Sequence, residues 1–87
     1  MTRPRLVTGA RLRYDDVRDE HLLLIPEGAV RLNQTAVEVL ELCDGERSLD
    51  EIVAALSERY GGADLDDDVH GLVHAMAERG LVIDAAA

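Results

Sequence analysis

The chain has 87 residues, enough for one small domain that hides only about 60% of the surface its unfolded chain exposes. Its hydrophobic content is 47%, but Tyr14 and Tyr60 are its only aromatic residues, which leaves little for stacking on nucleic-acid bases. The net charge is −9, and apolar runs such as residues 22–25 are far too short to cross a bilayer. Nothing at the N-terminus resembles a signal peptide, so we expect a cytoplasmic protein with no membrane partner.

The charge is unevenly distributed along the chain. The first 18 residues carry five arginines against two aspartates, a net charge of +3, and this leaves −12 on the remainder. Residues 1–9 contain Pro4 and Gly9 and show no periodicity, so we expect a flexible, solvated N-terminal arm. The alternative is a basic arm that becomes ordered when it binds an acidic partner.

Three short strands are expected after the arm. Residues 11–17 alternate between apolar and charged side chains, which favours a first strand. Residues 20–25 form the second strand, and its four consecutive apolar side chains point to both faces of the sheet. A turn at residues 26–28 precedes a third strand over residues 29–32. Because both faces of the second strand need cover, the arm, a second copy or a partner protein must meet the face that the helices leave open.

Two helices follow, and each begins at a residue that can cap it. Asn33 can cap a first helix over residues 34–43, which Gly45 can end by taking the left-handed conformation. Ser48 and Glu51 have the spacing of a capping box, which begins the second helix. Two helices joined by a tight turn and fed by a strand are typical of a helix-turn-helix or winged-helix unit.

A third helix is expected over residues 66–79. Three aspartates in its first turn suit the positive end of the helix dipole, and Gly80 follows as the residue past its end. Residues 81–83 form a short extended tail, and residues 84–87 are expected to fray. The sequence therefore predicts one α+β domain over residues 10–83, winged-helix-turn-helix-like, with three short antiparallel N-terminal strands followed by three helices.

An acidic stretch before the third helix invites a calcium interpretation. Asp64, Asp66 and Asp68 alternate as ligands do in a calcium loop. An EF-hand beginning at Asp64 needs glycine and glutamate where this chain has Val69 and Ala75. Helix capping and the helix dipole explain the stretch without a metal.

Two histidines and the cysteine are further candidates for a metal ligand or a nucleophile. His70 and His74 lie four residues apart, with Glu78 four further on, so their side chains can line one ridge. Such histidines can bind zinc, but the chain has no HExxH motif and no second ligand pair. Cys43 lies on the apolar stripe of the first helix, which favours a neutral thiol and a core position. We therefore expect no metal site, no cofactor and no enzyme activity.

The helix-turn-helix outline suggests a DNA-binding regulator as one alternative. Affinity for duplex DNA depends on lysine and arginine at the phosphates. This chain has no lysine, and three aspartates stand at the end of the candidate recognition helix that would enter the groove. We therefore expect no nucleic-acid partner.

Recognition of a peptide fits the pattern better. A three-stranded sheet has a free edge, at which an extended peptide can add as another strand. The third strand is the candidate edge, and the apolar stripe of the third helix is the candidate opposite wall. The alternative is that the helical positions are ordinary core, which the sequence favours for Leu72 and Met76. The candidate peptide-binding residues are Ala29, Val30, Arg31, Leu32, Val69, Leu72, Val73 and Met76.

A set of short motifs follows in one order along the chain. They are Ile25-Pro26-Glu27, Leu32-Asn33-Gln34-Thr35-Ala36, Leu42-Cys43-Asp44-Gly45, Ile52-Val53 with Leu56 and Tyr60, Asp68-Val69 and Gly80. In this order they resemble the PqqD family, peptide chaperones of pyrroloquinoline quinone (PQQ) biosynthesis and recognition elements for ribosomally made, modified peptides (RiPPs). The resemblance covers about residues 10–83, and LNQTA and LCDG are its most specific parts.

The resemblance implies a winged-helix-like domain that performs no chemistry itself. It implies that residues 29–32 and the stripe over residues 69–76 hold the precursor peptide PqqA as an added strand. It further implies presentation of PqqA to the radical S-adenosylmethionine (SAM) enzyme PqqE, which crosslinks a glutamate and a tyrosine. One cysteine cannot ligate an iron–sulfur cluster, so no cofactor is implied. Related domains serve other modified peptides, and a homodimer formed by exchange of N-terminal strands is a further alternative.

Overall fold

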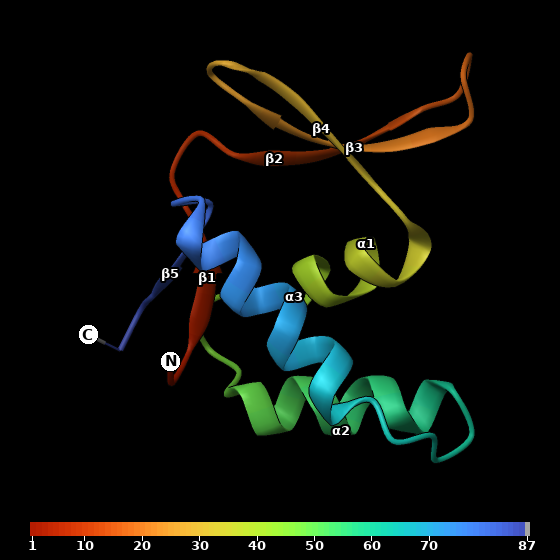
Figure 1. Ribbon diagram of the computed structural model, residues 1–87, viewed down its shortest axis with the longest axis vertical. Coiled ribbons are helices and arrows are strands. Elements are labelled where there is room, and N and C mark those ends of the chain that lie inside the picture. Colours follow the sequence, from red (N-terminus) through yellow and green to blue (C-terminus); the bar gives the residue numbers. More distant parts are fainter. Residues whose placement is uncertain (87) are drawn as a thin grey trace.

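The structure is a computed structural model that describes residues 1–86. A three-stranded antiparallel sheet lies on one side of the molecule, and the three helices all pack on the same face of it (Figure 1). A second, two-stranded sheet joins the two ends of the chain. The elements are β1 (Pro4–Leu6), β2 (Arg11–Asp15), β3 (Glu20–Ile25), β4 (Gly28–Leu32), α1 (Gln34–Glu41), α2 (Leu49–Arg59), α3 (Asp66–Glu78) and β5 (Val82–Asp84).

The larger sheet has the strand order β2-β3-β4, as the sequence predicts. At its centre Leu23 pairs with Leu12 on β2 and with Val30 on β4, and its side chain is fully buried against the helices. The strand predicted over residues 11–17 is β2, and it ends earlier, at Asp15. Asp15 Oδ1 accepts the backbone N–H of Val17 at 3.1 Å and so starts a turn. The opposite face of the sheet is not covered by another element within residues 1–86.

The predicted helix caps are confirmed. Asn33 Oδ1 accepts the N–H of Ala36 at 2.8 Å, and α1 begins at the next residue after Asn33. Ser48 and Glu51 form both hydrogen bonds of a capping box at the start of α2. Gly45 has a φ of 81°, and a Cβ there would lie 3.1 Å from a side chain of the C-terminal segment, so only glycine fits without strain.

The N-terminal segment differs from the prediction of a flexible arm over residues 1–9. Pro4–Leu6 form β1, which pairs with β5 in the register Leu6 to Val82 (Figure 1). The carboxylate of Asp84 also accepts the N–H of Thr2 at 2.9 Å and the N–H of Arg3 at 3.0 Å. The arm is therefore ordered by the far end of its own chain, a contact that no local pattern reveals.

The C-terminal segment differs from the prediction in the same way. Residues 81–83 are extended as expected, but β5 continues to Asp84, and the N–H of Ala85 donates to the carbonyl of Arg3 at 2.8 Å. The expected fraying over residues 84–87 is therefore wrong at its first two positions, and residue 87 lies outside the described part of the chain.

The core lies between the larger sheet and the helices. It is aliphatic, and Cys43 is part of it with 4% of its surface exposed, which confirms its interpretation as a core residue. Burial raises the pKa of the Cys43 thiol to about 12, with Asp44 adding to the effect. The largest fully buried side chains are Pro4, Leu23, Val39, Leu40, Ile52, Leu56, Val69 and Val73.

The α+β arrangement of antiparallel strands followed by three helices is thus confirmed, with β1 and β5 as additions. The likeness to a winged helix stays a prediction. Within the described chain, every helix is too short and too polar to span a membrane.

Candidate peptide-binding groove

One edge of β4 has no partner strand. β4 pairs with β3 on one side, and within residues 1–86 no backbone hydrogen bond reaches its other side. In an antiparallel pair, alternate residues exchange both bonds with the partner strand, and the intervening residues turn their N–H and C=O groups outward. The edge is therefore a row of backbone donors and acceptors available to an extended peptide.

Two cavities lie beyond the two ends of β4, and each is lined in part by α3 or by the segment that follows it. The first, which we call the Asp68 cavity, has a volume of about 320 Å³ and joins the end of β4 and the start of α1 to the first half of α3. Its lining residues are Asn33, Thr35, Ala36, Asp68 and Leu72.

The second cavity, which we call the Arg79 cavity, has a volume of about 400 Å³. It joins the β3–β4 turn to the segment that follows α3. Its lining residues are Val7, Thr8, Ile25, Pro26, Glu27, Arg79, Gly80 and Leu81. We take the space along the open edge of β4, from one cavity to the other, as the candidate groove, with α3 as its candidate opposite wall.

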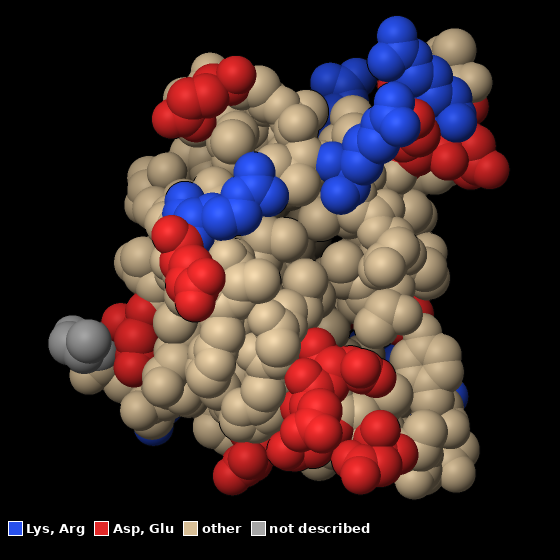
Figure 2. Space-filling model, viewed as in Figure 1, with Lys and Arg blue, Asp and Glu red and all other residues tan. Residues whose placement is uncertain are grey.

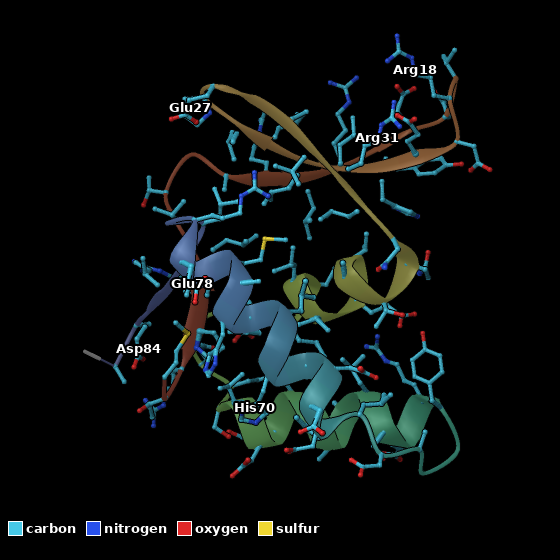
Figure 3. The ribbon with its side chains drawn as sticks, viewed as in Figure 1. Arg18, Glu27, Arg31, His70, Glu78 and Asp84 are labelled. Carbon is cyan, nitrogen blue, oxygen red and sulfur yellow. The ribbon has the colours of Figure 1, made fainter. Side chains whose placement is uncertain are left out.

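The candidate residues on β4 divide by face. Val30 and Leu32 are half-buried and pack against the core, whereas Ala29 and Arg31 are exposed. Arg31 lies on the side of the sheet away from α3 (Figure 3), where its Nε is 3.4 Å from Glu20 Oε1. The strand thus offers its backbone, with the side chains of Val30 and Leu32, to the groove side.

The candidate residues on α3 differ in how deeply they are buried, and the pattern is not the one that the sequence predicts. Val69, Val73 and Met76 have exposed fractions of 1%, 0% and 7%, so they are core residues. Leu72 is half-buried and lines the Asp68 cavity. The sequence favoured a core position for Leu72 and for Met76, and the structure agrees only for Met76. Direct contact of the three buried residues with a peptide stays a prediction.

Sequence reasoning missed the polar residues of the Asp68 cavity. From the sequence, Asn33 and Thr35 belong to a family motif at the start of the first helix, and Asp68 is a helix-dipole or calcium-ligand candidate, and none of the three is predicted to line a peptide site. The available signal was positional, because Asp68 and Leu72 are four residues apart and so share one face of α3. The start of α1 directly follows the candidate edge strand, which places it at the end of the groove.

Charge is segregated over the surface of the molecule. Arginines gather over the sheet and its β2–β3 turn, and acidic side chains gather over the beginning of α3 (Figure 2). Arg18 and Arg31 mark the basic region, and Glu78 lies far along α3 (Figure 3). A guest lying between β4 and α3 therefore has a basic region on one side and an acidic region at one end.

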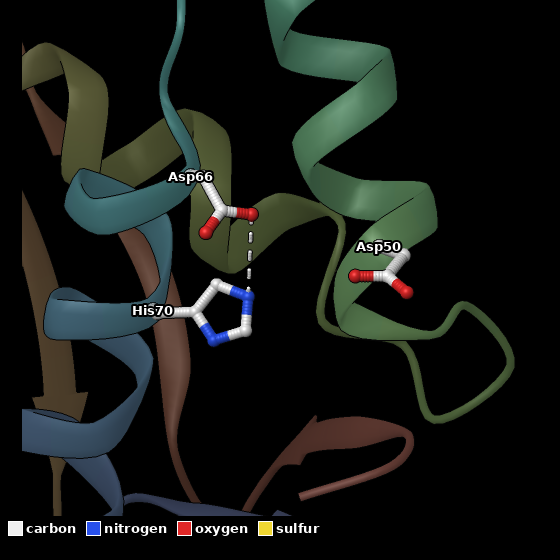
Figure 4. Close-up of side chains that lie close together, drawn as sticks. All are labelled: Asp50, Asp66 and His70. Carbon is white, nitrogen blue, oxygen red and sulfur yellow. Dashed lines mark ion pairs between the residues drawn. The ribbon is translucent and has the colours of Figure 1, made fainter.

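The histidines of α3 lie outside the groove. His70 Nε2 is 3.7 Å from Asp66 Oδ1, and its ring meets that of His74 edge to face, with centroids 6.0 Å apart. Asp50 approaches from α2, and the ligand atoms of Asp50, Asp66 and His70 lie within 4.8 Å of one another (Figure 4). The predicted ridge of histidines is thus turned toward α2, on the opposite face of α3 from Asp68 and Leu72.

The chain matches known proteins along most of its length. The family described as Coenzyme PQQ synthesis protein D (PqqD) matches residues 20–82. The PqqA binding protein of Rhodopseudomonas palustris (strain TIE-1) is 36% identical over 86 residues, which is 97% of this chain and 84% of that protein. The PqqA binding protein of Klebsiella pneumoniae (strain 342) is 45% identical over 62 residues, 70% of this chain and 67% of that protein.

Two solved structures share the fold. The PqqD truncation of Methylobacterium extorquens PqqCD, described as a functional and stand-alone RiPP recognition element, has a TM-score of 0.78 and 34% identity over 92% of this chain and 87% of that one. The crystal structure of PqqD from Xanthomonas campestris has a TM-score of 0.59 and 32% identity, over 87% of each chain. With the family matched over residues 20–82, this chain belongs to the PqqD family, coenzyme PQQ synthesis protein D.

Proposed function

We propose that the chain is a non-catalytic peptide chaperone of PQQ biosynthesis. It binds the precursor peptide PqqA as an added strand along β4 and presents it to the radical SAM enzyme PqqE. The observation that carries the proposal is the unpaired edge of β4, with a cavity at each of its ends. The relatives named PqqA binding protein support the identity of the guest.

Strand addition suits a protein that must hold a peptide without reacting with it. Main-chain hydrogen bonds supply affinity, and side-chain pockets fix the register of the guest. β4 has five residues, so at about 3.3 Å per residue the paired segment of the guest is roughly 16 Å long. The remainder of PqqA leaves the groove at the two cavities and is accessible to an enzyme.

The lack of chemistry in the groove supports a chaperone over an enzyme. The one thiol of the chain is buried and protonated, and it does not line either cavity. The two cavities are lined by aliphatic side chains, one amide, two hydroxyls, two carboxylates and one guanidinium. Such groups bind and orient a peptide, and the crosslinking reaction belongs to PqqE.

Titration of isotope-labelled protein with PqqA tests the binding site. We expect amide shifts to be largest over β4 and around Leu72, because added hydrogen bonds change the amide environment directly. Shifts confined to β1 and β5, with none over β4 or around Leu72, would contradict the assignment of the site. Titration with the leader peptide of another modified-peptide system tests the alternative guest, which should bind at least tenfold more weakly.

A proline scan along β4 tests strand addition itself. Proline removes a backbone donor, so at positions whose N–H faces the open edge it should weaken PqqA binding and leave the fold intact. At the intervening positions it breaks the pairing with β3 and lowers the free energy of unfolding. Ala29, Val30 and Arg31 cover both kinds of position, and the matched controls are Ala29→Gly and Val30→Ala. Equal PqqA affinity in all folded proline variants would exclude pairing at this edge.

Presentation to PqqE is a separate step with its own measurement. We expect the rate of the glutamate–tyrosine crosslink in PqqA to rise when this protein is added to PqqE. A proline variant that folds but does not bind PqqA should give the rate of PqqE alone. Rates that do not depend on this protein would leave peptide binding intact but exclude presentation.

A further inference from the structure

We infer that the Asp68 cavity holds a basic side chain of the guest peptide. The stem of a lysine or arginine lies on Leu72 and Ala36, and its cationic head meets the carboxylate of Asp68. This inference rests on the proposed strand addition, because the guest must first lie along β4. It makes binding depend on the sequence of the guest peptide, whereas strand addition alone depends on backbone hydrogen bonds.

The lining of the cavity matches an amphipathic side chain. Leu72 and Ala36 supply an apolar wall, and Asp68 is the single charged residue of the lining. Lysine and arginine bury their aliphatic stems along apolar surface while the charged head stays among polar groups. The volume of about 320 Å³ admits one such side chain.

The carboxylate of Asp68 supplies the charge of the cavity and has no cationic partner there. Within residues 1–86 it takes part in no ion pair, since the acidic partners found are Glu20, Asp44 and Asp66. Asn33 Oδ1 already accepts the N–H that caps α1, at 2.8 Å. A cation entering the cavity therefore meets an unshared negative charge, in a region where acidic side chains gather (Figure 2).

The two ends of the groove differ in their charged residues, and this difference predicts at which end a basic side chain of the guest binds. The Arg79 cavity contains Arg79 and Glu27, so both signs are present there. The Asp68 cavity carries only negative charge. A basic side chain is thus favoured where the guest passes the end of β4, and it fixes the register of the remaining residues along the strand.

Binding of PqqA and its single-substitution variants measures the requirement. Each lysine and arginine of PqqA is replaced in turn by norleucine and by glutamate, and dissociation constants are measured by calorimetry. One position should lose about two- to fivefold in affinity on replacement by norleucine, and more by glutamate. Asp68→Asn should cause a similar loss for unmodified PqqA and should make that position insensitive to norleucine.

Matched variants separate this pair from general electrostatics. Asp67→Asn removes the same charge one residue away, outside the cavity lining, and should change PqqA affinity less than twofold. Asp68→Lys should bind the glutamate variant of PqqA better than unmodified PqqA. Both affinities are measured on the same protein variant, so a change in its stability does not affect the comparison. Unfolding curves and amide spectra identify a variant that fails to fold.

The outcomes also separate this inference from the proposed function. If wild-type protein binds PqqA but no basic position is sensitive, or if Asp68→Asn and Asp67→Asn behave alike, the basic anchor is wrong and strand addition stands. If wild-type protein does not bind PqqA, the proposed function and the anchor fail together.

Discussion

At the residue scale, Cys43 tests the packing of the core. Its exposed fraction is 4%, its thiol donates to the carbonyl of Val39 at 3.4 Å, and burial raises its pKa from 9.0 to about 12. The reactive form of a cysteine is the thiolate, so modification by a thiol reagent at pH 8 should be on the order of a thousandfold slower than in the urea-unfolded chain. Absorbance of the released reagent measures both rates. Similar rates in the two states would mean that the core does not bury this side chain.

Asp84 is the residue whose charge matters most for joining the two chain ends. Hydrogen bonds from the backbone N–H groups of Arg3, Thr2 and Ala86 lower its pKa from 3.8 to about 2. A lowered pKa in the folded state means that its contribution to stability is present above pH 3.8 and is lost as the pH falls toward 2. The free energy of unfolding, measured by urea denaturation at pH 5, 4, 3 and 2.5, should therefore fall more steeply with decreasing pH for wild-type protein than for Asp84→Asn. Parallel curves would contradict this role, and Asp67→Asn is the control.

At the element scale, β1 distinguishes an ordered segment from a flexible arm. Pro4 is fully buried, the N–H of Gly45 donates to its carbonyl at 2.9 Å, and the N–H of Val7 donates to Leu81 at 2.9 Å. Deletion of residues 1–7 removes this burial and these bonds, so the free energy of unfolding should fall by at least about 2 kcal/mol. Chemical denaturation measures the change. Arg5→Ala is the control on the same strand because its side chain is exposed, and an unchanged stability on deletion would restore the flexible arm.

The elements that the sequence predicts are those whose signals are local. Asn33 and the Ser48–Glu51 pair cap helices through bonds to residues three positions away, so their chemistry is visible in a short window. β1 and β5 have no such signal, because each is three residues long and its partner lies at the other end of the chain. Their pairing is a property of the folded molecule, and loop closure over the full chain decides it.

The same distinction between local and long-range signals applies to the candidate site. The free edge of β4 was predictable, since the third of three strands in a meander has one neighbour. The helical wall was not, because periodicity finds the apolar stripe of α3 but does not say which of its residues faces the core. Val69, Val73 and Met76 belong to the buried core, and Leu72, at the rim of the stripe, lines the Asp68 cavity. The position of Asp68 in a cavity was not predictable, because the cavity forms from segments more than 30 residues apart.

At the scale of the whole molecule, small size makes binding and stability hard to separate. A domain of 87 residues buries a modest fraction of its surface, so the free energy of unfolding is small compared with what a bound guest can add. A guest that binds only the folded chain stabilises it by mass action. Thermal unfolding therefore reports which class of partner this fold accepts, without a labelled peptide.

The last prediction compares the two classes of partner directly. At a free PqqA concentration of about 100 times the dissociation constant, the free energy of unfolding rises by about 2.7 kcal/mol, which for a domain of this size raises the Tm by about 10–20 °C. Duplex DNA should leave the Tm unchanged at low salt, because the chain has a net charge of −9 and α3 begins with Asp66, Asp67 and Asp68. Differential scanning calorimetry measures both. A shift with DNA and none with PqqA would replace the chaperone with the regulator, because only a partner bound to the folded chain can raise its Tm.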